Sequence, residues 1–97
     1  MSAYSTLTSV QNYGLYANLT ASALVKTGPG NVIGVVINSH TAGTLKLEDA
    51  LTDTTPVIFN TITFGVGEHF IPFFGAKFLN GLYAVIGGTA NITIIYN

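Results

Sequence analysis

The feature that most constrains the fold of this chain is a two-residue alternation of apolar and polar side chains. In residues 44–48, TLKLE, the two leucines lie on one face of an extended strand, and Thr44, Lys46 and Glu48 lie on the other. Residues 91–97, NITIIYN, combine a similar alternation with the β-branched residues that strands favour. A helix repeats every 3.6 residues, so both segments predict β-strands rather than helices.

Five further segments have the composition of strands. They are residues 21–27, 31–38, 56–64, 68–74 and 82–87. The continuous apolar run NVIGVVIN is typical of a strand buried on both faces. Pro72 cannot donate a backbone hydrogen bond, so its segment is expected at a sheet edge or with a bend.

Turn-forming residues separate these segments. Residues 39–43, SHTAG, predict a short connection between two strands, with His40 in the turn. Residues 87–89, GGT, predict a hairpin that joins the last two strands, and residues 49–56 predict the longest loop. With seven or eight short strands and no convincing helix, the sequence predicts an all-β fold, an antiparallel β-sandwich or jelly roll.

The length of 97 residues corresponds to one domain. Residues 21–97 are expected to form the β-sandwich domain. Residues 1–20 are rich in Ser, Thr, Asn and Tyr. We expect them to form edge strands of the same sheet, or an N-terminal arm that adds a strand to a neighbouring subunit and so makes an assembly contact.

Charge is scarce along the whole chain. Only 7% of the residues are charged and 48% are hydrophobic, with a net charge of −1, whereas an average domain has about 25% charged residues. Such a surface gives little electrostatic protection against self-association. The plain interpretation is a neutral soluble domain. We favour a subunit of a permanent assembly and expect a homo-oligomer, with a trimer as one option.

Composition also argues against several classes of partner. Lys26, Lys46 and Lys77 are isolated, so nucleic-acid binding through phosphate neutralisation is not expected. No apolar run is long enough for a membrane-spanning helix, and no secretory signal is expected at the N-terminus. The absence of Cys excludes disulfides and thiolate chemistry. We therefore expect assembly in the cytoplasm.

The ionisable residues do not form a recognisable site. His40 could act as a base with Asp49 or Asp53 as its orienting partner, but no nucleophile motif accompanies them. Glu48, Asp49 and Asp53 could offer oxygens to Ca²⁺, but their spacing does not match a calcium loop. His69 would make a pH-sensitive contact if it lies in an interface. We expect no catalytic residue, metal site or cofactor, and no enzymatic activity.

Aromatic residues are the better candidates for contacts. Residues 70–78, FIPFFGAKF, hold four Phe in nine residues, so this segment either crosses the core or exposes an apolar patch that a partner covers. The predicted assembly contacts are Tyr4, Tyr13, Tyr16, Phe70, Phe73, Phe74 and Phe78. Exposed Tyr side chains also allow a different function, a carbohydrate-binding module in which they stack on sugar rings.

The order of these motifs resembles the small structural proteins of tailed bacteriophages. The resemblance rests on VINSHTAGTLKLED, PVIFNTITFGVGEHFIPF and GLYAVIGGTANITIIYN, and covers residues 31–97 but not residues 1–30. In that family a strand ending in Asn-Ser-His precedes a Gly-Thr-Leu/Ile hairpin, and a Gly-Leu-Tyr strand and a Gly-Thr turn precede the last strand.

The resemblance implies a virion structural protein whose partners are the major capsid protein or other virion subunits. We expect a capsid decoration or cement protein that stabilises the head shell, with a tail or fibre component as the alternative. The motifs are structural, so the resemblance assigns no functional residues.

Overall fold

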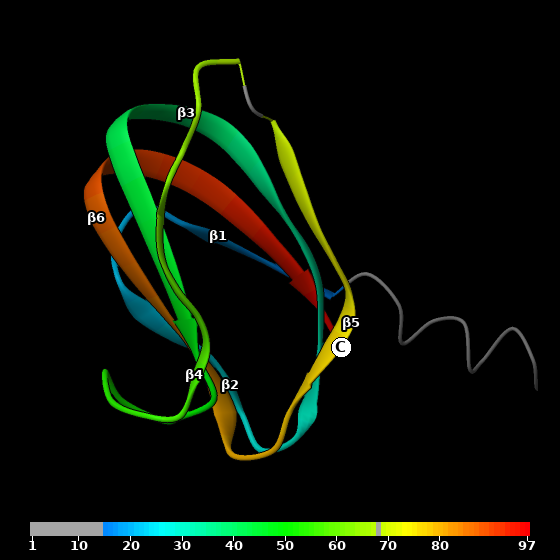
Figure 1. Cartoon of the computed structure of the whole chain (residues 1–97). Helices are drawn as coiled ribbons and strands as arrows, with labels where there is room; N and C mark the ends of the chain where they lie inside the picture. The colour runs from blue at the N-terminus through cyan, green and yellow to red at the C-terminus, as the bar shows by residue number, and fades with distance from the viewer. Residues whose placement is uncertain (1–14, 68) are drawn as a thin grey trace, which may run out of the picture.

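The computed structural model describes residues 15–67 and 69–97, which form six antiparallel strands (Figure 1). The strands are β1 (Leu15–Leu19), β2 (Ala23–Thr27), β3 (Gly30–Glu48), β4 (Val57–Thr63), β5 (Phe70–Phe78) and β6 (Gly81–Tyr96). The all-β antiparallel prediction is confirmed. Within the described residues there is no helix of the length and apolarity needed to cross a membrane.

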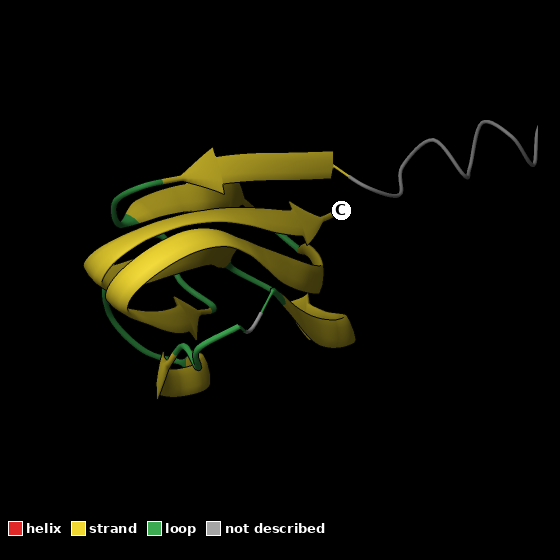
Figure 2. Cartoon of the chain, turned by 90° about the horizontal axis from the view of Figure 1, so that it is seen from above, coloured by secondary structure: helices red, strands yellow, loops and turns green. Residues whose placement is uncertain are grey.

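Two long strands, β3 and β6, organise the sheet. They pair with each other along most of their length. The first half of β3 also pairs with β5 and its second half with β4, while β6 pairs with β2 in its first half and with β1 in its second half. The result is one six-stranded sheet that curls, so that its two halves face each other across buried side chains (Figure 2).

Both long strands bend at the same place (Figure 1). Ala42 and Gly43 of β3 together lie opposite Gly88 of β6, and this extra residue defines a β-bulge, which increases the local twist. Ala42 and Gly88 have φ angles of 52° and 67°. A Cβ atom at Gly88 would collide with the carbonyl oxygen of Ala42. Only glycine therefore allows the two backbones to approach this closely.

The bend corrects two predictions. Residues 39–43 and 87–89 do not form hairpin turns, because the β3–β6 ladder continues across both of them. His40 therefore lies on a strand. The expected separate strands on either side of each segment are two halves of one strand, which gives six strands among the described residues rather than seven or eight.

The core lies between the two halves of the curled sheet. It consists of Val32, Val35, Ile37, Leu45, Leu47, Phe64, Phe78, Leu82, Ala84, Ala90, Ile92 and Ile94. Ten of these twelve side chains come from β3 and β6. Each fully buried aliphatic side chain contributes about 1.5–3 kcal/mol. Because one pair of strands carries most of the core, its register determines whether the apolar faces meet.

Part of the N-terminal segment, which was expected to span residues 1–20, belongs to the sheet. Residues 15–19 form β1, which pairs with β6 and belongs to the sheet. Residues 1–14 lie outside the described residues. The assembly contact expected of residues 1–20 therefore falls on two different parts of the chain: an ordered edge strand, and the sequence that precedes it.

Replacing Gly88 tests the bend. The G88A substitution should lower the unfolding free energy by roughly 2–4 kcal/mol, because the new methyl group adds a backbone collision to the penalty of a positive φ. G28A is the matched control: Gly28 has a φ of 88° and no atom within 4 Å of a Cβ position, so it should lose only about 1 kcal/mol. Equal losses in urea unfolding would show that the close approach is unimportant.

Candidate functional site

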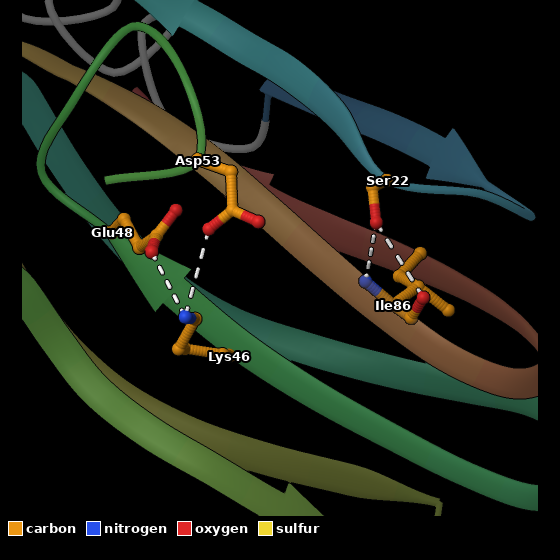
Figure 3. A network of polar contacts seen from close by, with 5 residues as sticks. All are labelled: Ser22, Lys46, Glu48, Asp53 and Ile86. Atoms are coloured by element: carbon orange, nitrogen blue, oxygen red, sulfur yellow. Dashed lines mark hydrogen bonds and ion pairs between the residues drawn. The ribbon is translucent and has the colours of Figure 1, made fainter.

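Lys46 lies between two carboxylates at the end of β3. Its Nζ atom is 3.1 Å from Oε2 of Glu48 and 3.6 Å from Oδ1 of Asp53 (Figure 3). The side-chain hydrogen bond to Glu48 raises the pKa of Lys46 above its usual value, although desolvation acts in the opposite direction. The two carboxylates and the ammonium group thus form one ion-pair network.

Glu48 lies on the polar face of its strand, opposite the leucines, but only 1% of its side chain is exposed. The loop that follows β3 brings Asp53 close to this face (Figure 3). The second oxygen of Glu48, Oε1, is buried without a hydrogen-bond partner among the described residues.

A different polar contact holds the chain before β2, where the Ser22 hydroxyl accepts a 2.8 Å hydrogen bond from the Ile86 N–H.

Asp49 faces a different part of the molecule. Its carboxylate accepts hydrogen bonds from the backbone N–H groups of Leu79 (2.9 Å), Asn80 (2.7 Å) and Gly81 (3.3 Å), in the turn between β5 and β6. Desolvation raises the pKa of Asp49, but these three hydrogen bonds outweigh it and lower the pKa below the usual 3.8. Asp49 therefore fastens a turn and does not join Glu48 and Asp53.

His40 is fixed in the bend of β3. Its Nδ1 atom accepts a 3.4 Å hydrogen bond from the Gly43 N–H, which leaves Nε2 to donate to the Gly65 carbonyl at 3.2 Å. The ring also packs edge to face on Phe64, with centroids 5.4 Å apart. Asp49 follows the far end of β3, where its carboxylate accepts hydrogen bonds from the β5–β6 turn, and Asp53 is paired with Lys46. The His–Asp pair considered from the sequence is therefore not formed.

The two histidines of the chain line one open pocket of about 250 Å³. Its walls are Ile37, Asn38, Ser39, His40, Val66, Gly67 and His69. Both ring nitrogens of His40 already have partners, so its imidazole acts as a wall of the pocket. Among the described residues, no group of three or more His, Asp or Glu side chains is placed to hold a metal ion.

The aromatic residues of β5 are divided between core and surface. Phe78 is fully buried, so it belongs to the core rather than to a contact surface. Phe73 is half-buried and stacks on Phe59, with ring centroids 4.8 Å apart. Phe70 and Phe74 face solvent, with exposed fractions of 50% and 90%. Of the four phenylalanines predicted as contacts, these two are available to a partner.

Phe74 has an unusual backbone. Three residues of β5, numbers 73–75, lie opposite the single residue Ile33 of β3. Phe74 and Gly75 have φ angles of 53° and 78°. A positive φ is unfavourable for a bulky side chain, and strain of this kind costs roughly 1–3 kcal/mol. The backbone is thus strained at a residue whose ring is almost entirely exposed to water. Packing of this ring inside the subunit contributes little stability that could offset the strain.

Some large side chains outside β5 are also exposed. Tyr16 on β1 is 72% exposed, whereas Tyr4 and Tyr13 lie outside the described residues. Leu79 is 64% exposed and Val66 is fully exposed, and neither was predicted as a contact residue from the sequence. Both lie in turns that flank β5. The sequence did contain a signal for Leu79, because a large apolar residue directly before the turn residues Asn80-Gly81 is expected to be exposed.

A scan against models of protein families, a search of curated proteins and a search of solved structures each gave no match. The functional interpretation therefore rests on the residues themselves.

Asp49 makes stability depend on pH. Because its pKa is lowered in the fold, its contribution is present above the usual pKa of 3.8 and is lost as the pH falls through the lower folded value. D49N should lose about 1–2 kcal/mol at pH 7 and show a weaker decline of stability in acid. D53N, at a carboxylate that is 58% exposed, should lose about 0–1 kcal/mol. Equal behaviour in urea titrations at several pH values would contradict this assignment.

Phe74 is exposed and Phe78 is buried, so substitutions at these two residues of β5 should affect stability differently. F74G relieves a positive φ worth about 1–2 kcal/mol but adds about 0.5–1 kcal/mol of chain entropy to the unfolded state. Its stability should therefore be unchanged or slightly higher. F78A removes a fully buried ring and should lose about 3–5 kcal/mol. Thermal unfolding checks both variants, and a large loss in F74G would show that Phe74 serves the fold.

Proposed function

We propose that this chain is a structural subunit of a virion, a capsid decoration or cement protein that binds across capsid subunits. The observation that carries the proposal is Phe74, an aromatic ring 90% exposed on a strained backbone. Strain that does not serve the fold indicates a contact outside it. The low charge of the chain and its resemblance to small phage structural proteins support the same interpretation.

The function of such a subunit is mechanical. Phe70 and Phe74 on β5 and Leu79 in the turn that follows it offer exposed apolar anchors, and buried aromatic anchors dominate the energy of many interfaces. A stable interface of ordinary size buries about 1,600 Å² in total. On a symmetric shell, repeated contacts to the major capsid protein reinforce one another through multivalency. A shell covered in this way resists expansion better.

We also propose that the curled sheet is best described as a β-sandwich. The bends in β3 and β6 divide each strand into two halves. One layer then contains β1, the end of β6, the start of β3 and β5. The other contains β2, the start of β6, the end of β3 and β4. This description makes the expected two-layer form compatible with six continuous strands.

A carbohydrate-binding function is the second candidate, and one observation favours it. Near the exposed Tyr16, the side-chain amides of Asn18 and Asn38 both donate hydrogen bonds to Oδ1 of Asn91, at 2.8 and 3.0 Å. An ordered row of amides beside an aromatic ring could bind sugar hydroxyls. A glycan array separates the two functions: specific binding that is lost in Y16A would favour sugar recognition.

The proposed function is tested on particles of the virus that encodes the chain. Wild-type protein added to purified heads that lack it should bind to saturation, and F74G should bind at least tenfold more weakly while remaining folded. K77A, at an exposed residue of the same strand, is the control and should bind normally. Location of the chain on tails rather than heads would support the tail or fibre alternative. Its absence from virions would overturn the proposal.

A further inference from the structure

The sheet has four edge strands, β1, β2, β4 and β5, each paired with one neighbour among the described residues. An edge strand presents unpaired backbone N–H and C=O groups to solvent, and proteins normally block such edges with lysine, proline or bulges. The way each edge is built therefore indicates which one is free to pair with another chain.

Three of the edges carry blocking features. Pro72 and the bulge at residues 73–75 interrupt β5. On β2, Lys26 is part of the edge and the register shifts between Leu24 and Lys26. The pairing of β4 with β3 shifts register twice within a few residues. Each of these irregularities twists the strand or removes a regular row of hydrogen-bonding groups.

β1 has none of these features. Its five residues, LYANL, pair with β6 in an unbroken register. They include no Pro, Gly or charged residue, and Leu15 and Tyr16 are 46% and 72% exposed. The Asn18 side chain fastens the strand to β6 through 3.0 Å and 3.1 Å hydrogen bonds to the Ile92 carbonyl and the Thr93 hydroxyl. The edge is thus regular, uncharged and held in place.

The sequence around this edge also lacks repulsive charge. Lys26 is the first Asp, Glu, Lys or Arg in the chain, so residues 1–25 carry no charged side chain. Two copies can therefore bring these segments together without like-charge repulsion. An antiparallel strand pair has two-fold symmetry, so an edge strand is complementary to a second copy of itself.

We propose that β1 pairs edge to edge with β1 of a second copy of this chain, antiparallel and across a two-fold axis, so that two sheets become continuous. The proposal rests on the proposed function in treating the chain as an assembly subunit, and it names the surface that joins the copies.

The chain has no cysteine, which makes site-specific cross-linking a direct test. Single-cysteine variants Y16C, A17C and N18C are oxidised in the full chain, with L24C on β2, 42% exposed at Leu24, as the control. A disulfide needs Cα atoms about 4.4–6.8 Å apart. Dimer yield should therefore peak at one β1 position near the axis and stay low in L24C. No excess over L24C, or equal yields at all positions, would overturn the proposal.

Sedimentation equilibrium provides a second test that needs no oxidation. Wild-type protein should form a dimer, and Y16K should raise the dissociation constant at least tenfold, because it places like charges on both copies of the edge. L24K adds the same charge to β2 and should leave the dimer intact. A wild-type monomer at every concentration, or a dimer unaffected by Y16K, would contradict the proposed surface.

The other occupant of this edge would be the chain's own residues 1–14. If deletion of residues 2–14 converts a monomer into a dimer, that segment covers the edge and the proposal is wrong. These experiments use no virus particles. If the chain forms cross-linked dimers but is absent from virions, only the proposed function is rejected. If the chain binds heads but never dimerises, only the β1 contact is rejected.

Discussion

The pairing of β3 with β6 is the interaction on which the rest of the structure depends. These two strands supply most of the core and carry the four shorter strands on their outer sides. Their common bend, where Ala42 and Gly43 lie opposite Gly88, allows one continuous sheet to close on its own apolar face. Without the bend, Leu45 and Ile92 would lie apart on one open face of the sheet and would remain in water.

The sequence predicted the apolar faces but not the way in which they meet. Two-residue alternation correctly placed Leu45 with Leu47, and Ile92 with Ile94, on one face of each strand, because side-chain direction in a strand is a local property. All four side chains are buried. A glycine-rich segment looks the same whether it forms a hairpin turn or a bend. The difference at Gly88 lies in the partner strand, which bends at the same register, and single-sequence patterns do not contain that information.

The candidate contact residues show the same limit. Phe70, Phe74 and Phe78 are separated by even numbers of residues, so simple alternation places them on one face. The register shift between Val32 and Gly34 of β3 and the bulge in β5 separate them, with Phe78 in the core and Phe74 in solvent. Burial of Glu48 was also not predictable, since it depends on where the following loop folds.

The proposed function rests on backbone strain and on exposed apolar side chains. Twelve apolar side chains are buried in the core, while the irregular backbone at Phe74 presents a ring to solvent, and the regular edge of β1 is unpaired among the described residues. These features are the ones that support the proposal of a subunit that binds other chains. Sparse charge, which would make an isolated monomer prone to association, suits a subunit with fixed partners.

Hydrogen–deuterium exchange of the chain, free and bound to heads, tests the central claim most directly, because it reports which backbone amides a partner covers. Binding to heads should add protection in residues 70–79, while residues 15–19 should already be protected in the free dimer and exchange in the 49–56 loop should be unchanged. Protection confined to the histidine-lined pocket, at residues 37–40 and 66–69, or no protection at either strand, would contradict it.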